Sequence, residues 1–314
     1  MISGMAICVV IPFYNAIDFL TPRYMAFLGA LKADKNITCV FWDSSSTDGT
    51  EQQLEDIGFD QVHVISPDDF DHGGSRTLAA QTCDSDVVVF LTQDALPVSK
   101  DDLYRLTLAF ENPAVGAAYG RQLPHEDAHF FARHLRGFNY PGKSHIYSLS
   151  DVKEQGIKAA FLSNAFCAYR RSAMDDVGWF PDGLLISEDL YAGVKLLKAG
   201  YSLAYVSEAC VFHSHNYSVL QEFRRYFDVG AFHRMESGSL ADFTQVGSEG
   251  WKYVKSEWRL LFKEKRYAQF FEFFLRNGLK FLGYHLGRRY RWLPSQLVIK
   301  FSMHPRWWRQ YLAQ

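Results

Sequence analysis

Four short apolar runs in the first third of the chain, separated by helix-type patterns, most constrain its fold. We expect strands near residues 6–12, 37–42, 61–65 and 86–91. A run that is apolar throughout is typical of a parallel strand covered by helices on both faces, because a half-exposed strand would alternate. The alternation of strand and helix therefore predicts an α/β fold with a mostly parallel central sheet.

A proline and several polar residues mark the ends of three of these runs. They are Pro12, Tyr14, Asn15, Asp43, Ser45, Gln93 and Asp94. Open α/β sheets bind ligands beyond the carboxyl ends of their strands, so these residues are candidates for a ligand site. Asp94 offers a hard oxygen donor that suits Mg²⁺ or Mn²⁺ held against a phosphate. Both aspartates could instead only organise the turns that follow their strands.

An anion cradle is predicted at His72-Gly73-Gly74-Ser75-Arg76, directly before a helical pattern. Glycines such as Gly74 let backbone N–H groups approach a phosphate closely, and a helix N-terminus favours negative charge. Arg76 could place its guanidinium fork on phosphate oxygens. The alternative is an ordinary surface arginine at the start of a helix.

A pair of acids, Glu188 and Asp189, opens a second helical pattern that Gly200 ends. Two neighbouring carboxylates raise one another's pKa, which suits a general base near neutral pH. The alternative is simple charge complementarity at a helix N-terminus.

The order of these segments resembles the family-2 inverting glycosyltransferases, which have the nucleotide-sugar-binding α/β fold called GT-A. The resemblance covers roughly residues 5–235. Its finer form, to bacterial rhamnosyltransferases, rests on three further stretches. These are Phe70-Asp71-His72-Gly73-Gly74-Ser75-Arg76, Phe161-Leu162-Ser163-Asn164-Ala165 and Val211-Phe212-His213-Ser214-His215-Asn216-Tyr217-Ser218, the last extended by residues 221–230.

The resemblance implies roles for individual residues. Asp43 would read the N3–H of uracil or thymine, and Asp189 would be the base, with Glu188 shaping the site. Asp94 would hold the metal with His213 or His215, because many relatives have a second Asp where this chain has Thr92. Either histidine could instead be a core residue. By position alone, the acceptor-side candidates are Ser163, Asn164, Trp179 and Tyr226.

Residues 121–160 are rich in His, Gly and Pro, so we expect irregular structure or a mobile loop there. The five cysteines have no paired spacing and lie mostly in apolar runs; they are Cys8, Cys39, Cys83, Cys167 and Cys210. They read as buried thiols of a reducing compartment, without a zinc site or disulfides. No signal peptide or membrane-spanning segment is expected.

The carboxyl-terminal part differs from the rest of the chain. Residues 251–314 carry 14 Lys/Arg against three Asp/Glu, although the whole chain has a net charge of −2. They also hold 17 aromatic residues. Basic residues mixed with Trp and Phe are typical of segments that lie in an anionic lipid interface. The alternatives are a helical hairpin packed on the catalytic domain, a homodimer contact and, least favoured, a nucleic-acid surface.

These observations predict a GT-A domain at residues 1–236 and a basic, aromatic helical extension at 237–314. The implied activity is metal-dependent transfer of L-rhamnose from dTDP-β-L-rhamnose to a lipid-linked saccharide, in O-antigen or cell-wall polysaccharide synthesis. The expected location is the cytoplasmic face of the membrane, without nucleic acid as a partner. A UDP-hexose donor and a non-catalytic scaffold of the same fold are the two alternatives.

Overall fold

A computed structural model describes residues 4–59, 62–66, 71–244 and 249–314. Its sheet has the strand order β3-β2-β1-β4-β8-β6-β9-β5, with β7 beside β9. The strands are β1 Ile7–Phe13, β2 Ile37–Asp43, β3 Val62–Val64, β4 Val87–Leu91, β5 Leu96–Pro97, β6 Val115–Leu123, β7 His145–Tyr147, β8 Phe166–Arg170 and β9 Ser202–Phe212. The four strands expected near the amino terminus are thus confirmed within a residue or two. Two of the residues used above, Phe70 and the first residue of run 61–65, lie outside the described residues.

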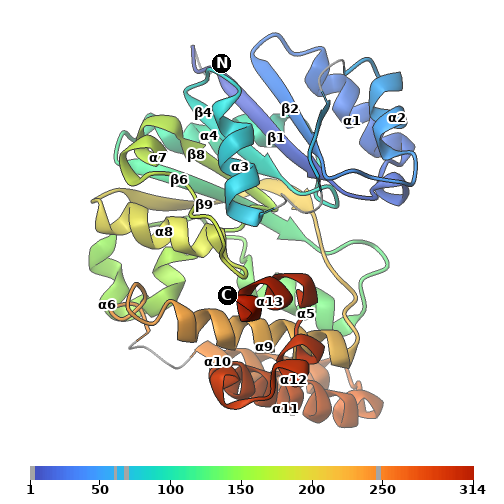
Figure 1. The fold of residues 1–314 in the computed structure, drawn as a ribbon, viewed down its shortest axis with the longest axis vertical. Helices are drawn as coiled ribbons and strands as arrows, with labels where there is room; N and C mark the ends of the chain where they lie inside the picture. The colour runs from blue at the N-terminus through green and yellow to red at the C-terminus, as the bar shows by residue number, and fades with distance from the viewer. Residues whose placement is uncertain (1–3, 60–61, 67–70, 245–248) are drawn as a thin grey trace.

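The helices lie on both faces of this sheet and below it (Figure 1). They are α1 Pro22–Lys32, α2 Thr50–Asp56, α3 His72–Gln81, α4 Asp101–Thr107, α5 Phe130–Asn139, α6 Val152–Gln155, α7 Arg171–Val177, α8 Glu188–Lys198, α9 Val219–Met235, α10 Glu249–Lys263, α11 Phe270–Gly287, α12 Ser295–Phe301 and α13 Pro305–Ala313.

Alternate side chains of β1 enter two different cores, which is why its sequence is apolar throughout. Cys8 and Val10 belong to the core under α3, α7 and α8, whereas Val9 and Ile11 belong to the core under α1, α2 and α4. Parallel pairing aligns the starts of β1, β2 and β4, so their carboxyl ends form one edge of the sheet. Antiparallel β8 between β4 and β6 makes the sheet mixed.

Two expectations from the sequence are wrong, one about residues 121–160 and one about the cysteines. Residues 121–160 contain helix α5 and strand β7, because apolar residues of α5 such as Phe130 and Phe131 bury one of its faces. Cys8 and Cys83 form a disulfide, with their Cα atoms 6.5 Å apart. The parallel sheet brings β1 against the end of α3, a proximity that a sequence separation of 75 residues does not reveal.

The carboxyl-terminal helices pack on α9 through glycines. A Cβ atom at Gly287 of α11 would lie 2.8 Å from the carbonyl carbon of Phe227, and one at Gly230 would lie 2.9 Å from that of Tyr284. The two backbones therefore touch, as small residues at a helix crossing allow. A core around Trp308 of α13 also includes Phe227 and Leu185. Within the described part of the chain, none of the helices combines the length and apolar content needed to span a bilayer.

Candidate active site

A carboxylate and two imidazoles converge beyond the end of β4. Asp94 Oδ2 lies 3.4 Å from His213 Nε2 and 3.7 Å from His215 Nδ1. One ligand atom from each of the three residues lies within 4.8 Å of the others. Asp94 follows β4 and the histidines follow β9, so the sheet itself brings these segments together. The predicted grouping of Asp94 with both histidines is what the geometry shows.

A hydrogen bond at Nδ1 orients the His213 ring so that its Nε2 faces Asp94. Its Nδ1 lies 2.8 Å from Gln122 Oε1, an oxygen that also accepts a hydrogen bond of 2.6 Å from Arg136. A carboxamide oxygen can only accept, so Nδ1 carries the proton and the lone pair is on Nε2. A partner that fixes the tautomer in this way is typical of metal-binding histidines.

The protonation states also suit a cation. Burial raises the pKa of Asp94, but the His213 and His215 side chains beside it outweigh this effect and lower the pKa below its usual range. Burial lowers the pKa of His213, and burial together with His213 lowers the pKa of His215 to about 3. The cluster therefore presents one anion and two neutral imidazoles at neutral pH. This donor set fits Mn²⁺ and is less suited to Mg²⁺.

The acid pair lies at the start of α8. Burial raises the pKa of Asp189, and the Glu188 carboxylate raises it further. Glu188 is itself kept ionised, because Arg76 lies 3.1 Å away and, with His72, outweighs the effect of burial on its pKa. Asp189 is half-buried, whereas Glu188 is buried. The surroundings thus shift the pKa values of the two neighbouring carboxyl groups in opposite directions.

Asn164 joins the two acids to each other. Its side-chain amide donates to Glu188 Oε1 at 3.1 Å, and its backbone N–H donates to Asp189 Oδ2 at 3.2 Å. The neighbouring Ser163 accepts a hydrogen bond of 2.8 Å from Gln122, the residue that holds His213. A short series of contacts therefore connects Asp94 and its two histidines with the acid pair. Ser163 and Asn164 build this chain, and an acceptor role for them stays a prediction.

The predicted anion cradle is wrong in its main feature. Asp71 caps α3 and accepts hydrogen bonds from the backbone N–H groups of Gly73 and Gly74, at 3.0 and 2.6 Å. A Cβ atom at Gly73 would collide with the backbone carbonyl of Pro181, so this glycine is needed for close packing of the loop before α8. Arg76 is buried and faces Glu188 instead of an open phosphate site.

The polar residues after β1 and β2 form a tight set of turns. The backbone N–H of Tyr14 donates to Gln93 Oε1 at 2.7 Å, and Gln93 Nε2 donates back to the Tyr14 carbonyl at 3.1 Å. This pair ties the end of β1 to the end of β4. The Tyr14 ring is 54% exposed, which leaves it available to a ligand.

Asn15, Ser45 and Asp43 make the adjoining turn. The Asn15 backbone N–H donates to Ser46 Oγ at 2.8 Å, and Ser45 donates to the Ile65 carbonyl at 2.7 Å. Asp43 is fully buried and both of its oxygens accept from Ser46, at 2.8 and 2.5 Å. In this geometry Asp43 organises the turn, and its contact with a base stays a prediction. Pro12 lines a small cavity beside Trp42 and Arg76.

Two acceptor-side candidates point away from the site. Trp179 is 3% exposed and donates to Asp175 at 2.7 Å, so it is a core residue. Tyr226 faces the carboxyl-terminal helices, where Lys280 Nζ lies 5.9 Å from its ring centre. On a helix the adjacent position points elsewhere, and Arg225 lies over the Tyr217 ring, which stacks on His215. An acceptor role for Tyr226 therefore has no support in these contacts.

Arg136 and Arg225 are two candidate site residues that the sequence did not indicate. Arg136 is connected to His213 through Gln122, and Arg225 to His215 through Tyr217. Both lower the pKa of His215. Two guanidinium groups beside a candidate metal site could bind a diphosphate. A signal existed only for Arg225, which lies in the stretch 221–230, whereas Arg136 lies in the segment expected to be irregular.

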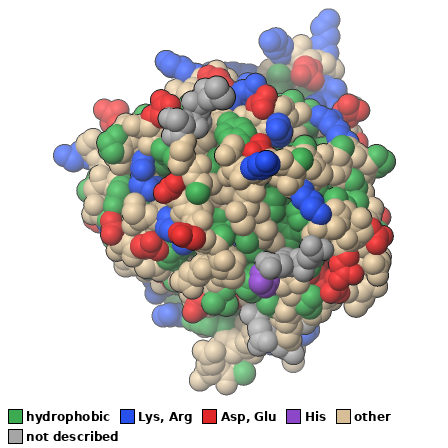
Figure 2. Space-filling model, turned by 90° about the horizontal axis from the view of Figure 1, so that it is seen from above, with side chains coloured by type: hydrophobic (Ala, Val, Ile, Leu, Met, Phe, Trp, Pro, Cys, Tyr) green, Lys and Arg blue, Asp and Glu red, His purple; other side chains and the backbone are tan. Residues whose placement is uncertain are grey.

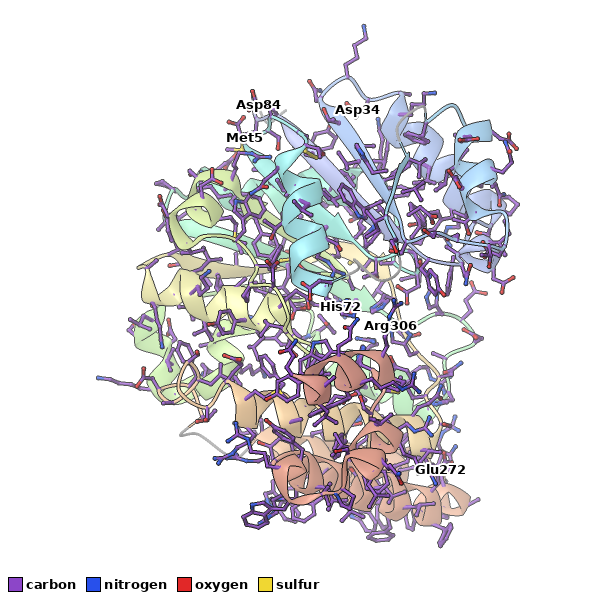
Figure 3. The ribbon with its side chains drawn as sticks, in the orientation of Figure 1. Met5, Asp34, His72, Asp84, Glu272 and Arg306 are labelled. Atoms are coloured by element: carbon purple, nitrogen blue, oxygen red, sulfur yellow. A yellow bond between two sulfur atoms is a disulfide. The ribbon has the colours of Figure 1, made fainter. Side chains whose placement is uncertain are left out.

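The last helix also reaches the site. Trp307 of α13 donates to the Gly183 carbonyl at 3.1 Å, in the loop that leads to the acid pair. The rings of His304 and His72 lie 5.6 Å apart, and Figure 3 shows His72 and Arg306 side by side between the sheet and the lower helices. The extension is thus part of the architecture around Glu188.

Comparison with known proteins identifies the class to which this fold and site belong. The family described as Glycosyl transferase family 2 matches residues 8–178, more than half of the chain. The chain belongs to this family. The fold agrees: the mannosyltransferase PcManGT from Pyrobaculum calidifontis, solved with GDP-Man and Mn²⁺, has a TM-score of 0.62 at 13% identity. The comparison covers 90% of this chain and 87% of that one. S. aureus TarS 1–349 in complex with UDP-GlcNAc has a TM-score of 0.55 at 16% identity, over 95% of this chain and 84% of that one.

Within the family, the chain is similar over nearly its whole length to two curated proteins. It is 41% identical to O-antigen chain rhamnosyltransferase RfbN of Salmonella typhimurium strain LT2, over 97% of this chain and 96% of the relative. It is also 41% identical to O-antigen chain rhamnosyltransferase WbaN of Salmonella anatum, over 95% and 94%. The expected family and GT-A-type α/β fold are therefore confirmed.

Proposed function

We propose that this protein transfers L-rhamnose from dTDP-β-L-rhamnose to a hydroxyl of a lipid-linked saccharide, with inversion at the anomeric carbon. The observation that carries the proposal is the chain of contacts from the Asp94 cluster to the acid pair through Gln122 and Asn164. This connection supports the proposal that the diphosphate site and the base act on the same bound donor. The names of the two curated relatives supply the sugar and the O-antigen setting.

Asp189 would accept the proton of the acceptor hydroxyl. Its raised pKa makes it a stronger base than an ordinary carboxylate, and an ionised Glu188 beside Arg76 stabilises the arrangement around it. Attack from this side displaces the nucleoside diphosphate on the opposite side, which inverts the anomeric centre.

Asp94, His213 and His215 would hold Mn²⁺ or Mg²⁺, and the ion would supply positive charge against the departing diphosphate. Arg136 and Arg225 would add charge-assisted hydrogen bonds to the same phosphates. Asp94→Ala and Asp189→Asn are each expected to abolish transfer while the thermal unfolding curve still shows a folded protein. Near-normal turnover in either variant would remove its assigned role.

A donor panel tests the proposal directly. Purified protein is incubated with dTDP-rhamnose, UDP-hexoses and GDP-mannose, with and without Mn²⁺, and nucleotide release and thermal shift are recorded. We expect a response confined to dTDP-rhamnose and dTDP, and stronger with metal. A response to a UDP-hexose would keep the mechanism and overturn the rhamnosyl assignment, whereas binding of none of these nucleotides would favour a non-catalytic scaffold.

We also propose that the protein works at the cytoplasmic face of the membrane, as a peripheral protein. A lipid-linked acceptor would be anchored there, and the basic, aromatic composition of residues 251–314 suits such a surface. Association of two copies through the same region is the alternative.

A further inference from the structure

Helix α11 has its polarity reversed relative to an ordinary surface helix. Its outward face carries Phe271, Phe274 and Phe281, which are 79%, 61% and 68% exposed. Its inward face carries Arg276 and Lys280, which are only 4% and 6% exposed. A surface helix normally buries its apolar stripe and exposes its charges. Helix α11, which is 18 residues long, instead exposes phenylalanines and buries an arginine and a lysine.

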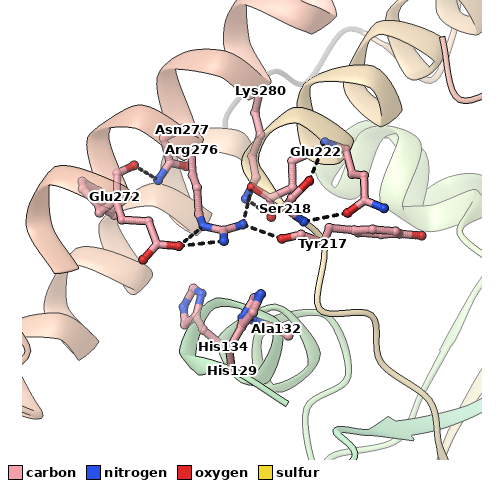
Figure 4. A network of polar contacts seen from close by, with 12 residues as sticks. His129, Ala132, His134, Tyr217, Ser218, Glu222, Glu272, Arg276, Asn277 and Lys280 are labelled. Carbon is pink, nitrogen blue, oxygen red and sulfur yellow. Dashed lines mark hydrogen bonds and ion pairs between the residues drawn. The ribbon is translucent and has the colours of Figure 1, made fainter. Parts of the chain in front are cut away.

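The buried charges keep the helix in this orientation. Arg276 lies 3.1 Å from Glu222 of α9 and 2.7 Å from Glu272, and it donates to the Tyr217 carbonyl at 2.9 Å (Figure 4). Lys280 lies 3.4 Å from the same Glu222. Rotating α11 to bury the phenylalanines would carry Arg276 and Lys280 into solvent and leave Glu222 without these partners in a dry interface, which costs several kcal/mol.

Close backbone packing opposes rotation as well. Gly283 and Gly287 lie on the inward face, where a Cβ atom would collide with the carbonyl groups of Phe223 and Phe227 on α9. Only the glycine face of α11 fits this crossing. The outward position of the phenylalanines is therefore fixed by the way the helix is built into the fold.

The outward stripe is continuous and has basic residues at both ends. Leu275 and Leu282, 41% and 46% exposed, lie between the phenylalanines at the spacing of one helix face. Trp292, just beyond the helix, is 81% exposed. The exposed basic residues that flank the stripe are Lys263, Lys265, Arg288, Arg289 and Arg291. At the opposite end of the molecule, side chains of both signs are interspersed (Figure 2).

We propose that the outward face of α11 lies flat in an anionic lipid surface, with its phenylalanines below the headgroups and the flanking cations among them. This inference rests on the proposed function only in that a lipid-linked acceptor would be presented at such a surface. Aromatic and aliphatic side chains flanked by Lys and Arg are the composition that binds this interface. The helix is about 27 Å long at 1.5 Å per residue, so the whole stripe can contact one flat surface.

A second copy of the chain fits this face less well. An antiparallel pair would bring Lys263 and Lys265 against Arg288, Arg289 and Arg291 of the other copy, and a parallel pair would set each cluster against itself. Like charges across an interface are repulsive. Anionic lipid headgroups would neutralise the basic residues at both ends of the stripe at once. We therefore favour a lipid surface over a second copy of the chain.

Vesicle flotation tests the proposal without donor or acceptor. The full-length protein is mixed with phosphatidylcholine vesicles, with or without about one third phosphatidylglycerol. We expect flotation with the anionic vesicles and at least a ten-fold loss in the double variant Phe274→Asp/Phe281→Asp. The double variant Leu108→Asp/Leu149→Asp is the matched control, because it adds the same two charges at exposed leucines outside α11, 45% and 47% exposed. The double variant Arg288→Gln/Arg289→Gln should bind more weakly and lose its dependence on phosphatidylglycerol.

Thermal unfolding and dTDP binding of each variant establish that it is folded. Failure of the wild-type protein to float with anionic vesicles would overturn the proposal. So would a dimer in size-exclusion chromatography that the Phe274→Asp/Phe281→Asp variant breaks while vesicle binding is unchanged, since the stripe would then be a protein interface. Because flotation requires no sugar transfer, a negative donor panel would leave this result intact.

Discussion

Removing the charge of Glu188 should move the pH dependence of transfer by an amount that the structure allows us to work out. Burial and the Glu188 carboxylate raise the pKa of Asp189 to about 7. As the base, Asp189 must be deprotonated, so the wild-type rate should fall as the pH drops through this value. In Glu188→Gln the amide oxygen can still accept from Asn164, but the neighbouring negative charge is gone.

The size of the shift follows from the charges around Asp189. Both acids contact Asn164, so their separation is on the order of 6 Å, and one unit charge contributes about 3 kcal/mol there at an effective dielectric constant of about 20. Arg76, 3.1 Å from Glu188, is present in both forms and lowers the pKa of Asp189 in each, so it does not change the difference. The expected shift is therefore about 3 kcal/mol, or about two pKa units downward. Burial is unaffected, so the pKa stays above the usual range of an aspartate.

The assay is the pH profile of kcat with saturating donor and acceptor, from about pH 5 to 9. Glu154→Gln is the control, because it removes a carboxylate that is exposed on α6. The reasoning fails if the acid limb of the wild type lies near pH 4, where an unperturbed carboxyl titrates. It also fails if Glu188→Gln leaves that limb in place while Asp189→Asn is inactive.

Three further outcomes follow from the packing and the site. Gly287→Ala should destabilise the protein by about 3 kcal/mol, because the added methyl meets the Phe227 backbone. Gly278→Ala, in open space on the same helix, should stabilise it by about 0.5–1 kcal/mol, and equal melting temperatures would contradict this account of the α9 contact. His213→Ala should weaken Mn²⁺ binding at least ten-fold when free Mn²⁺ is followed by electron paramagnetic resonance; an unchanged isotherm would exclude His213 as a ligand. Arg225→Gln should weaken dTDP binding about ten-fold in a fluorescence titration without lowering the melting temperature, and an unchanged Kd would place Arg225 outside the diphosphate site.

The sequence predicts the parts of this protein that depend on local patterns. The strands at the amino terminus are apolar runs that end in polar residues, and each of these runs is a strand in the sheet. Asp94 was identifiable as a candidate because it follows such a strand, whereas His213 and His215 became candidates through the family resemblance. Helix α8 was likewise recognisable, because Glu188 and Asp189 mark its start and Gly200 follows its end.

What the sequence does not reveal depends on contacts between distant segments. The glycines at the start of α3 suggested a phosphate cradle, but Asp71 occupies their N–H groups and the loop near Asp182 fills the space. The Cys8–Cys83 disulfide depends on the approach of a strand and a helix end. Arg136 reaches the site only because α5 packs beside β6, where Gln122 lies, and no spacing rule places it there.

Contacts of the carboxyl-terminal extension would connect the proposed membrane surface with the candidate active site. Arg276, on the inward face of α11, donates a hydrogen bond to the Tyr217 carbonyl. The Tyr217 ring stacks on the His215 ring, with the two ring centres 4.9 Å apart. On the other side, Trp308 packs in one core with Leu185, three residues before Glu188. The elements that would rest on the lipid surface thus also support both the metal-side histidines and the acid-side loop. A lipid-linked acceptor held at that surface would approach a site whose two ends are braced from the same side of the molecule.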